Sequence, residues 1–267
     1  MRLAWAFFSR DAAIALSYRF SFAAQLFGNF LLVGLLYFVS KTAGLDHVPA
    51  LKAYGGSFMA FVLIGVALTD CVLVSLVSFA QQVRESQTTG TLEATLISPV
   101  PLPLILIYST LWSYFLSAIR FVLYLIAGAA LGSLNMSTIN VPASIVIFFL
   151  TVCSFLGLGI LWAGIVLLIK RGEALMGLLS IVVMLLSGML FPITVLPGWL
   201  QFLAGLVPLT TALEAMRMAV LRGTDLSQLG TLLLKLSAFA VVLLAAGFWG
   251  FHWAVKLGRR NGSLTEY

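Results

Sequence analysis

The residues best placed to do chemistry are charged side chains inside long apolar runs. Asp70 lies about midway along the run 58–80, and Arg120 lies within the run that follows Pro103. A charge in hydrocarbon is costly because no water solvates it. If the later run begins at the interface near Leu106, the depths of the two residues differ by roughly 6 Å at ~1.5 Å per residue. The sequence therefore predicts a buried Asp70–Arg120 ion pair, which would either lock two helices together or contact the polar head group of a substrate.

A second pair of opposite charges follows further along the chain. Glu214 and Arg217 are three positions apart and would share one face of a helix. They lie in the apolar region 192–228, which Pro192, Pro197 and Pro208 divide into short pieces. We expect a structural ion pair that anchors this helix, with contact to a substrate as the alternative.

The polar segment 81–101, QQVRESQTTGTLEATLISPVP, interrupts the apolar runs. Its charges, Arg84, Glu85 and Glu93, cannot stay in lipid without a large cost. The segment must therefore lie in water or against another protein.

Within that segment, Gly90–Pro99 has the pattern of a short helix. Gly90 or Thr91 would begin it, and Glu93 in the first turn would be favoured by the helix dipole. Pro99 would end it. Leu92 and Leu96, four apart, would share a face able to enter a cleft on a partner. The alternative is a loop that only joins two spans.

Residues for conventional catalysis or metal binding do not form a pattern. His47 and His252 are 205 positions apart, and Cys71 and Cys153 lie in separate apolar runs without metal spacing. The sequence has no H-E-x-x-H motif and no G-x-x-x-x-G-K-[ST] loop for nucleotide phosphates. We predict no catalytic residue, no metal site and no cofactor bound by this chain.

The elements that position these residues are apolar helices. Of the 267 residues, 61% are apolar and only 9% are charged, against roughly 25% charged in soluble domains. This composition predicts an all-α membrane protein with six transmembrane helices. Their expected bounds are Phe20–Ser40, Phe58–Ala80, from after Pro103 to Leu131, Ala143–Ile169, Ala174–Phe191 and Leu229–Val255.

Two further regions would be helical without crossing the membrane. Residues 1–19 predict an amphipathic interface helix with Arg2 and Arg10 on its polar face, although this stretch could instead extend the first span. Residues 192–228 predict two short re-entrant helices, Gly198–Leu206 and Thr210–Leu221, because neither is long enough to cross about 30 Å of hydrocarbon.

The distribution of basic residues predicts the orientation. Six spans place both termini on one side, which would carry nine of the 15 Lys and Arg residues against five on the other. The positive-inside rule then places both termini, and segment 81–101, in the cytoplasm. The net charge of +6 is explained by these basic loops and does not indicate a nucleic-acid partner.

Two blocks of sequence resemble one family. The pattern R-E-S-x-x-x-G-T-L-E-x-x-L-x-S-P-V, residues 84–100, is similar to the segment after the second span in permease subunits of type-2 ABC exporters. The second block resembles the fifth span and re-entrant helices of that family. It comprises Ser187-Gly188, Phe191-Pro192, Leu196-Pro197, Trp199-Leu200, Pro208-Leu209-Thr210, Leu213-Glu214 and Arg217. The resemblance extends over the whole chain as a single transmembrane domain, 1–267.

The resemblance implies a partner and a mechanism. A coupling helix in segment 81–101 would dock on a separate ATP-binding subunit that holds ATP and Mg²⁺, and two permease copies, expected as a homodimer, would enclose the path. The coupling residues implied are Arg84, Glu85, Gly90, Thr91, Leu92, Glu93, Leu96 and Pro99. The re-entrant region, with Pro192, Pro197, Pro208, Glu214 and Arg217, would close the outer mouth.

The expected location is a bacterial cytoplasmic (inner) membrane, with membrane lipids around the chain. A hydrophobic or amphipathic cargo, drug-like or lipid-like, is the first expectation, and a polysaccharide or lipid-linked glycan is the second. The alternative of another class is an ATP-independent channel or a membrane-embedded enzyme.

Overall fold

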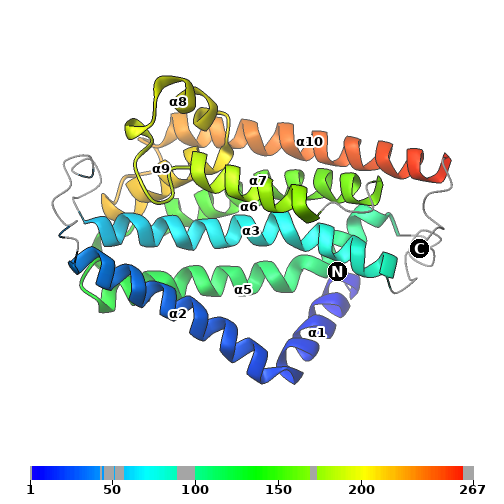
Figure 1. The fold of residues 1–267 in the computed structure, drawn as a ribbon, viewed down its shortest axis with the longest axis horizontal. Helices are drawn as coiled ribbons and strands as arrows, with labels where there is room; N and C mark the ends of the chain where they lie inside the picture. Colours follow the sequence, from blue (N-terminus) through cyan, green and yellow to red (C-terminus); the bar gives the residue numbers. More distant parts are fainter. Residues whose placement is uncertain are drawn as a thin grey trace.

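The structure is a computed structural model that describes residues 2–42, 44, 51, 57–88, 100–168 and 173–260. The described residues form nine α-helices and two short 3-10 helices, without a β-strand (Figure 1). The α-helices are α1 (Arg2–Ser17), α2 (Arg19–Thr42), α3 (Phe58–Thr88), α5 (Leu102–Ala130), α6 (Val141–Leu168), α7 (Glu173–Leu186), α8 (Gly198–Gly205), α9 (Pro208–Leu221) and α10 (Gly230–Arg260). The 3-10 helices are η3 (Met136–Thr138) and η4 (Ile193–Val195).

The long helices α3, α5, α6 and α10 run along the longest axis of the molecule (Figure 1). Helix α3 is the most deeply buried of the four and packs against both α5 and α6. Its residues Phe61–Leu68 are almost all inaccessible, as expected for a helix that is apolar on every side. Helix α3 is therefore the central element on which the other helices are arranged.

Helices α6 and α10 pack closely because glycines face each other. A Cβ atom on Gly157 would meet the backbone carbonyl of Leu243, and one on Gly247 would meet the carbonyl oxygen of Gly157. Small residues allow helix backbones in a membrane to approach in this way.

Four helices are long and apolar enough to cross a membrane: α3, α5, α6 and α10. The bent pair α8–α9, whose axes meet at 87°, would bring the count to five if it formed one span. The described apolar stretches of α2 and α7, Phe27–Thr42 and Gly177–Leu186, are shorter. The chain is thus an all-helical integral membrane protein with four to five candidate spans, and the count of six remains a prediction.

Three helix boundaries differ from those predicted by five residues or more, and one of them is the end of α10 at Arg260, five residues past Val255. Helix α3 continues to Thr88, eight residues past the expected end of the second span, because the polar residues after Ala80 favour a helix as readily as a loop. Helix α7 ends at Leu186 instead of Phe191. Gly188 adopts a φ of 74°, a conformation that glycine takes easily and that ends a helix.

The N-terminal helix is separate from the first apolar helix. Helices α1 and α2 are divided by a turn at Tyr18 and form a V beneath the bundle (Figure 1). A plain extension of the first span would need one continuous helix, so the prediction of a distinct N-terminal helix is correct.

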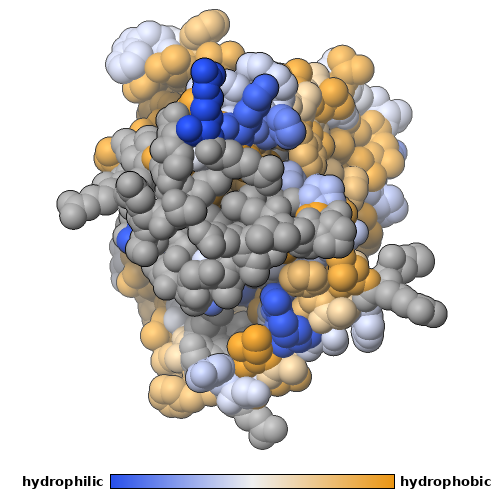
Figure 2. Space-filling model, turned by 90° about the vertical axis from the view of Figure 1, so that its right-hand side faces the viewer, coloured by the Kyte–Doolittle hydropathy of each residue, from blue (hydrophilic) through white to orange (hydrophobic). Residues whose placement is uncertain are grey.

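Polar side chains gather at one end of the molecule. Figure 2 faces that end, where a few strongly hydrophilic residues lie among apolar ones. The start of α1 and the end of α10 both lie there (Figure 1).

Candidate functional site

The predicted charges of α3 and α5 lie together. Arg120 Nε donates a hydrogen bond of 2.7 Å to Asp70 Oδ2. The Arg120 side chain is 8% exposed and that of Asp70 is 25% exposed, so the pair is mostly shielded on the arginine side. The contact uses only one nitrogen of the guanidinium, which leaves both Nη groups available.

A small recess adjoins this pair on the side of α2. It is lined by Asn29 and Phe30 of α2 and by Arg120, Leu123 and Tyr124 of α5, and its volume of about 10 Å³ suits a single water-sized group. Asn29 of α2 and Arg120 of the ion pair therefore line the same recess.

Arg217 of α9 occupies a second polar site. It is only 3% exposed. Its Nη2 lies 3.0 Å from the carbonyl oxygens of both Gly188 and Met189, which follow α7, and 3.2 Å from that of Phe61 in α3. The guanidinium carbon also lies 3.3 Å from the centroid of the Phe61 ring. One side chain thus holds three elements together, and we call it the Arg217 clasp.

The Glu214–Arg217 ion pair stays a prediction, and the contacts described for Arg217 are with backbone carbonyls. Glu214 is exposed, whereas Arg217 is only 3% exposed. Three residues along a helix bring two side chains to one face, but α9 is buried on most sides, and the nearby carbonyls bind the guanidinium. Arg217 anchors α9 through the backbone carbonyls of Phe61, Gly188 and Met189.

The three prolines begin the short helices of the region 192–228. Pro192 precedes η4, Pro197 precedes α8 and Pro208 is the first residue of α9. Pro208 suits the first turn of α9 because its fixed φ fits a helix and its missing N–H would have no partner there, whereas Pro192 and Pro197 are N-caps with ψ of 140° and 149°. The short helices expected at Gly198–Leu206 and Thr210–Leu221 are thus present within a few residues.

The family of the chain follows from a comparison with protein-family models. Residues 41–249 match the model described as ABC-2 family transporter protein. The chain belongs to this family. The matched range contains the Asp70–Arg120 pair, the segment 89–99 and the Arg217 clasp. In a comparison with curated proteins, no sequence matches the chain.

Membership in the ABC-2 family gives a function to the membrane helices. The chain is a permease component of an ABC transporter, and the family implies an ATP-binding partner. The residues predicted to couple to that partner divide into two groups. Arg84 and Glu85 lie in the last two turns of α3. The others fall outside the described residues: Gly90, Thr91, Leu92, Glu93, Leu96 and Pro99.

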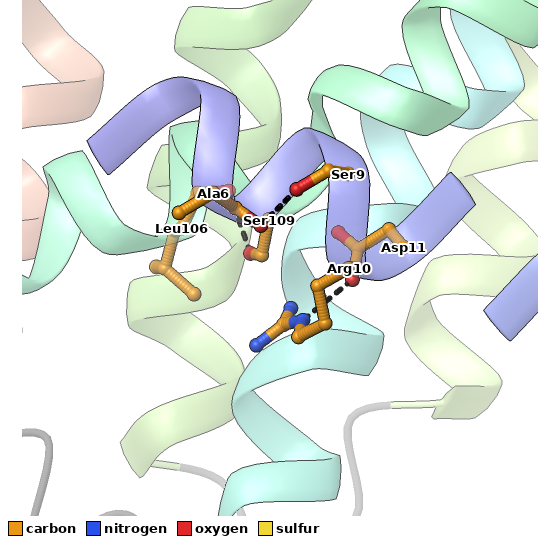
Figure 3. A network of polar contacts seen from close by, with 6 residues as sticks. All are labelled: Ala6, Ser9, Arg10, Asp11, Leu106 and Ser109. Carbon is orange, nitrogen blue, oxygen red and sulfur yellow. Dashed lines mark hydrogen bonds and ion pairs between the residues drawn. The ribbon is translucent and has the colours of Figure 1, made fainter. Parts of the chain in front are cut away.

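The N-terminal helix of this ABC-2 permease packs against α5 through aromatic rings. The Phe8 ring lies 5.2 Å from Trp112 and 5.5 Å from Phe115, measured between centroids in edge-to-face geometry. The polar groups mostly pair locally (Figure 3): Arg10 Nε bonds Asp11 Oδ1 at 2.8 Å, and the Ser9 hydroxyl donates to its own helix. Helix α1 is thereby fixed to the bundle through its apolar side.

Sequence reasoning missed three parts of these sites. Asn29 carried a usable signal, because an amide in the middle of an apolar run is itself unusual. The carbonyl of Phe61 gave none, because every residue has a carbonyl. Gly65 is needed because a Cβ there would meet the Met189 carbonyl oxygen, a contact between segments far apart in the sequence.

Proposed function

We propose that this chain is the membrane subunit of an ATP-driven exporter in which α3 carries the motion of the ATP-binding partner across the membrane. The observation that supports this most directly is the continuity of α3 from Phe58 to Thr88. At ~1.5 Å per residue, its 31 residues extend about 46 Å, more than the hydrocarbon thickness. A single helix thus connects segment 89–99 to the opposite end of the protein.

The end of α3 next to segment 89–99 is fixed to its neighbours. Phe79 and Val83 are buried in a cluster with Leu106 of α5, Ile160 of α6 and Phe251 of α10. Protein interiors are close-packed, so a displacement of this end moves the surrounding helices with it. The helix predicted at Gly90–Pro99 is the part that docks on the ATP-binding subunit, with Leu92 and Leu96 in a cleft.

The opposite end of α3 is tied to the region proposed to close the outer mouth. The Arg217 clasp bonds the Phe61 carbonyl of α3 to the turn after α7 and to α9. Rotation or translation of α3 would therefore change the position of α7 and α9. The apolar cluster at one end of α3 and the Arg217 clasp at the other would together transmit motion from the ATP-binding subunit to the region that closes the path.

The remaining parts of the proposal follow from charge and composition. Six crossings place both termini and segment 89–99 in the cytoplasm, in agreement with the excess of basic residues on that side. Two copies form a homodimer around the path in a bacterial inner membrane. The cargo is an amphipathic, drug-like or lipid-like molecule, because the spans carry few charges and the loops are short.

The deciding experiment uses the permease with a candidate ATP-binding subunit, taken from a neighbouring reading frame that encodes a P-loop. The two chains are co-purified and reconstituted in nanodiscs, where ATP hydrolysis is measured with candidate lipids, drugs and glycans. Transport is measured for the same cargoes in vesicles. We expect co-purification, and stimulation of hydrolysis by an amphipathic cargo. Stimulation only by glycans would replace the cargo proposed here, and transport without ATP would reject the exporter.

The coupling role is tested with the double variant Glu93→Lys, Leu96→Asp. We expect it to lose co-purification with the ATP-binding subunit, or to keep ATP hydrolysis without transport. Ser133→Ala, in the connection between α5 and α6, is the control and should behave like the unmodified protein. Normal assembly and export by the double variant would reject docking through Gly90–Pro99.

A further inference from the structure

The recess beside the Asp70–Arg120 pair contains polar groups without partners. Among the described residues, the two Nη nitrogens of Arg120, the Asn29 amide and the Tyr124 hydroxyl make no hydrogen bond. Arg120 is 7% exposed and Tyr124 is 5% exposed, whereas Asn29 is partly exposed. A buried polar group without a partner costs free energy, and a charged one costs more.

The recess lies near the middle of the bilayer. Asn29, Asp70 and Arg120 are 13, 12 and 10 residues from the ends of their helices at Thr42, Phe58 and Ala130. At ~1.5 Å per residue these separations are about 15–20 Å, which is roughly half of the 30 Å hydrocarbon layer. Bulk water cannot satisfy the donors at this depth.

The helix that covers the recess is open to lipid. Figure 1 shows α2 diverging from the bundle toward its N-terminal end. Its aromatic and aliphatic side chains Phe27, Phe30 and Leu31 are each at least 50% exposed. A molecule in the bilayer can therefore reach the side of α2 without crossing a packed helix interface.

We propose that this recess binds the polar head group of an amphipathic molecule that enters sideways from the bilayer between α2 and α5. This inference rests on the proposed function and assigns a binding site to its cargo. The volume of the recess admits one oxygen-bearing group, and the chain of the ligand lies along the exposed apolar side of α2. The Arg120 Nη groups and the Asn29 amide donate hydrogen bonds to that oxygen.

The charges of the site define the head group. Asp70 already neutralises Arg120, so a net anion would add an uncompensated charge in a medium of low dielectric constant. A neutral or zwitterionic head group with an exposed carbonyl, hydroxyl or phosphoryl oxygen avoids that cost. The site is therefore assigned to neutral and zwitterionic amphipaths.

Photolabelling of the permease alone tests this assignment. The protein is placed in phosphatidylcholine vesicles that contain a trace of one of two probes with a diazirine on the head group, a phosphatidylcholine or a monoacylglycerol. A third probe carries the diazirine at the end of an acyl chain. We expect both head-group probes to label residues 27–31 and 119–124, because their diazirines reach the middle of the bilayer only if one oxygen of the head group occupies the recess and the rest of the head group lies beside α2.

Labelling elsewhere provides the internal reference. A second, apolar groove of about 380 Å³ lies between α5 and α6 and is lined by Ile126, Ile145 and Phe148 among others. The acyl-chain probe should label this groove, and the head-group probes should not. Equal labelling of the groove and the recess by the head-group probes would show that the recess has no preference for polar groups.

Variants separate ligand binding from helix locking. The single variant Asn29→Leu keeps the ion pair. The double variant Asp70→Asn, Arg120→Gln replaces the ion pair with a neutral hydrogen-bonded pair. We expect both to reduce head-group labelling about tenfold, the effect of losing a hydrogen bond to a charged or buried group. Ser237→Ala is the control, because the Ser237 hydroxyl bonds only its own helix at Leu233.

The outcomes are decisive in both directions. If neither head-group probe labels the recess, or if the variants label like the unmodified protein, the site does not bind head groups and the ion pair only locks helices. Because this measurement needs neither ATP nor the partner subunit, it can fail while ATP-driven export stands, and it can succeed if export fails.

Discussion

Arg217 on α9 binds the backbone carbonyl of Phe61 on α3 through two nitrogens, Nε at 3.3 Å and Nη2 at 3.2 Å. The same guanidinium covers the Phe61 aromatic ring. A carbonyl inside a helix already accepts a bond from the residue four positions later, and its second lone pair can accept a bond from a side chain. The arginine therefore joins α9 to α3 without breaking the helix.

Replacing Arg217 should destabilise the protein strongly. Arg217→Met removes the donors from the carbonyls of Phe61, Gly188 and Met189 and should lower the free energy of unfolding by about 3 kcal/mol or more. Arg217→Lys should lower the free energy of unfolding by less than Arg217→Met does. A lysine keeps a charged donor, but it lacks the planar fork with which arginine reaches several carbonyls at once. Thermal unfolding of the purified permease in detergent measures both.

The control for this prediction is Glu214→Gln. Glu214 is exposed and outside the clasp, so the unfolding temperature should stay within the range of ordinary surface substitutions. A loss of stability in Glu214→Gln as large as in Arg217→Lys would support the predicted ion pair between Glu214 and Arg217.

Exchange of the charges at Asp70 and Arg120 should separate stability from transport. Each single substitution, Asp70→Arg or Arg120→Asp, places two like charges together in the membrane interior and should prevent a stable fold. The double exchange restores an ion pair across α3 and α5, so folded protein should reappear on size-exclusion chromatography. Transport should not return, because the arginine would then extend from α3 and leave the recess on α5. Full recovery of transport would show that only the lock matters.

Much of the helical architecture could be predicted from the sequence because apolar runs and breakers act locally. Pro192 and Pro197 directly precede short helices and Pro208 is the first residue of one, because a helix start tolerates the missing N–H of proline. The Asp70–Arg120 contact was also predictable, because two isolated charges of opposite sign at similar depth have few other partners.

The parts that could not be predicted depend on contacts between distant segments. Residues three apart on a helix share a face in any amphipathic pattern, but only the packed structure shows that Arg217 faces the carbonyls after α7 while Glu214 faces outward. The early end of α7 likewise depends on the positive φ of Gly188, which a Ser-Gly pair allows but does not require.

The α6–α10 contact should be sensitive to a single methyl group. In Gly157→Ala the new Cβ would meet the backbone of Leu243, which cannot move aside as a flexible side chain would. We expect the helices to separate and the unfolding free energy to fall by about 1–3 kcal/mol, as in other overpacked interiors. The matched control is Gly34→Ala in α2, where a Cβ meets nothing within 4 Å. Equal unfolding temperatures for the two variants would contradict the close approach.

Gly65 and Arg217 should be energetically coupled. A Cβ on Gly65 would meet the Met189 carbonyl oxygen and lie 3.2 Å from Arg217 Nη2, so Gly65→Ala should push the turn after α7 away from the guanidinium. The substitution should destabilise the protein although it removes no hydrogen-bonding group. Chemical denaturation in detergent measures the free energy of unfolding of this variant. The control is Gly28→Ala, because a Cβ at Gly28 meets nothing within 4 Å.

The double variant Gly65→Ala, Arg217→Lys then tests whether both residues act through one contact. If Gly65→Ala has already weakened the hydrogen bonds of the clasp, Arg217→Lys can remove less stabilisation. The loss of unfolding free energy in the double variant should then be smaller than the sum of the two single losses by about 0.5–3 kcal/mol. Losses that simply add would mean that Gly65 affects only the packing of α3, and that the turn after α7 is held by Arg217 independently of α3. In that case the clasp could not carry motion from α3 to α7, and the route proposed for opening the outer mouth would have to pass through α9 alone.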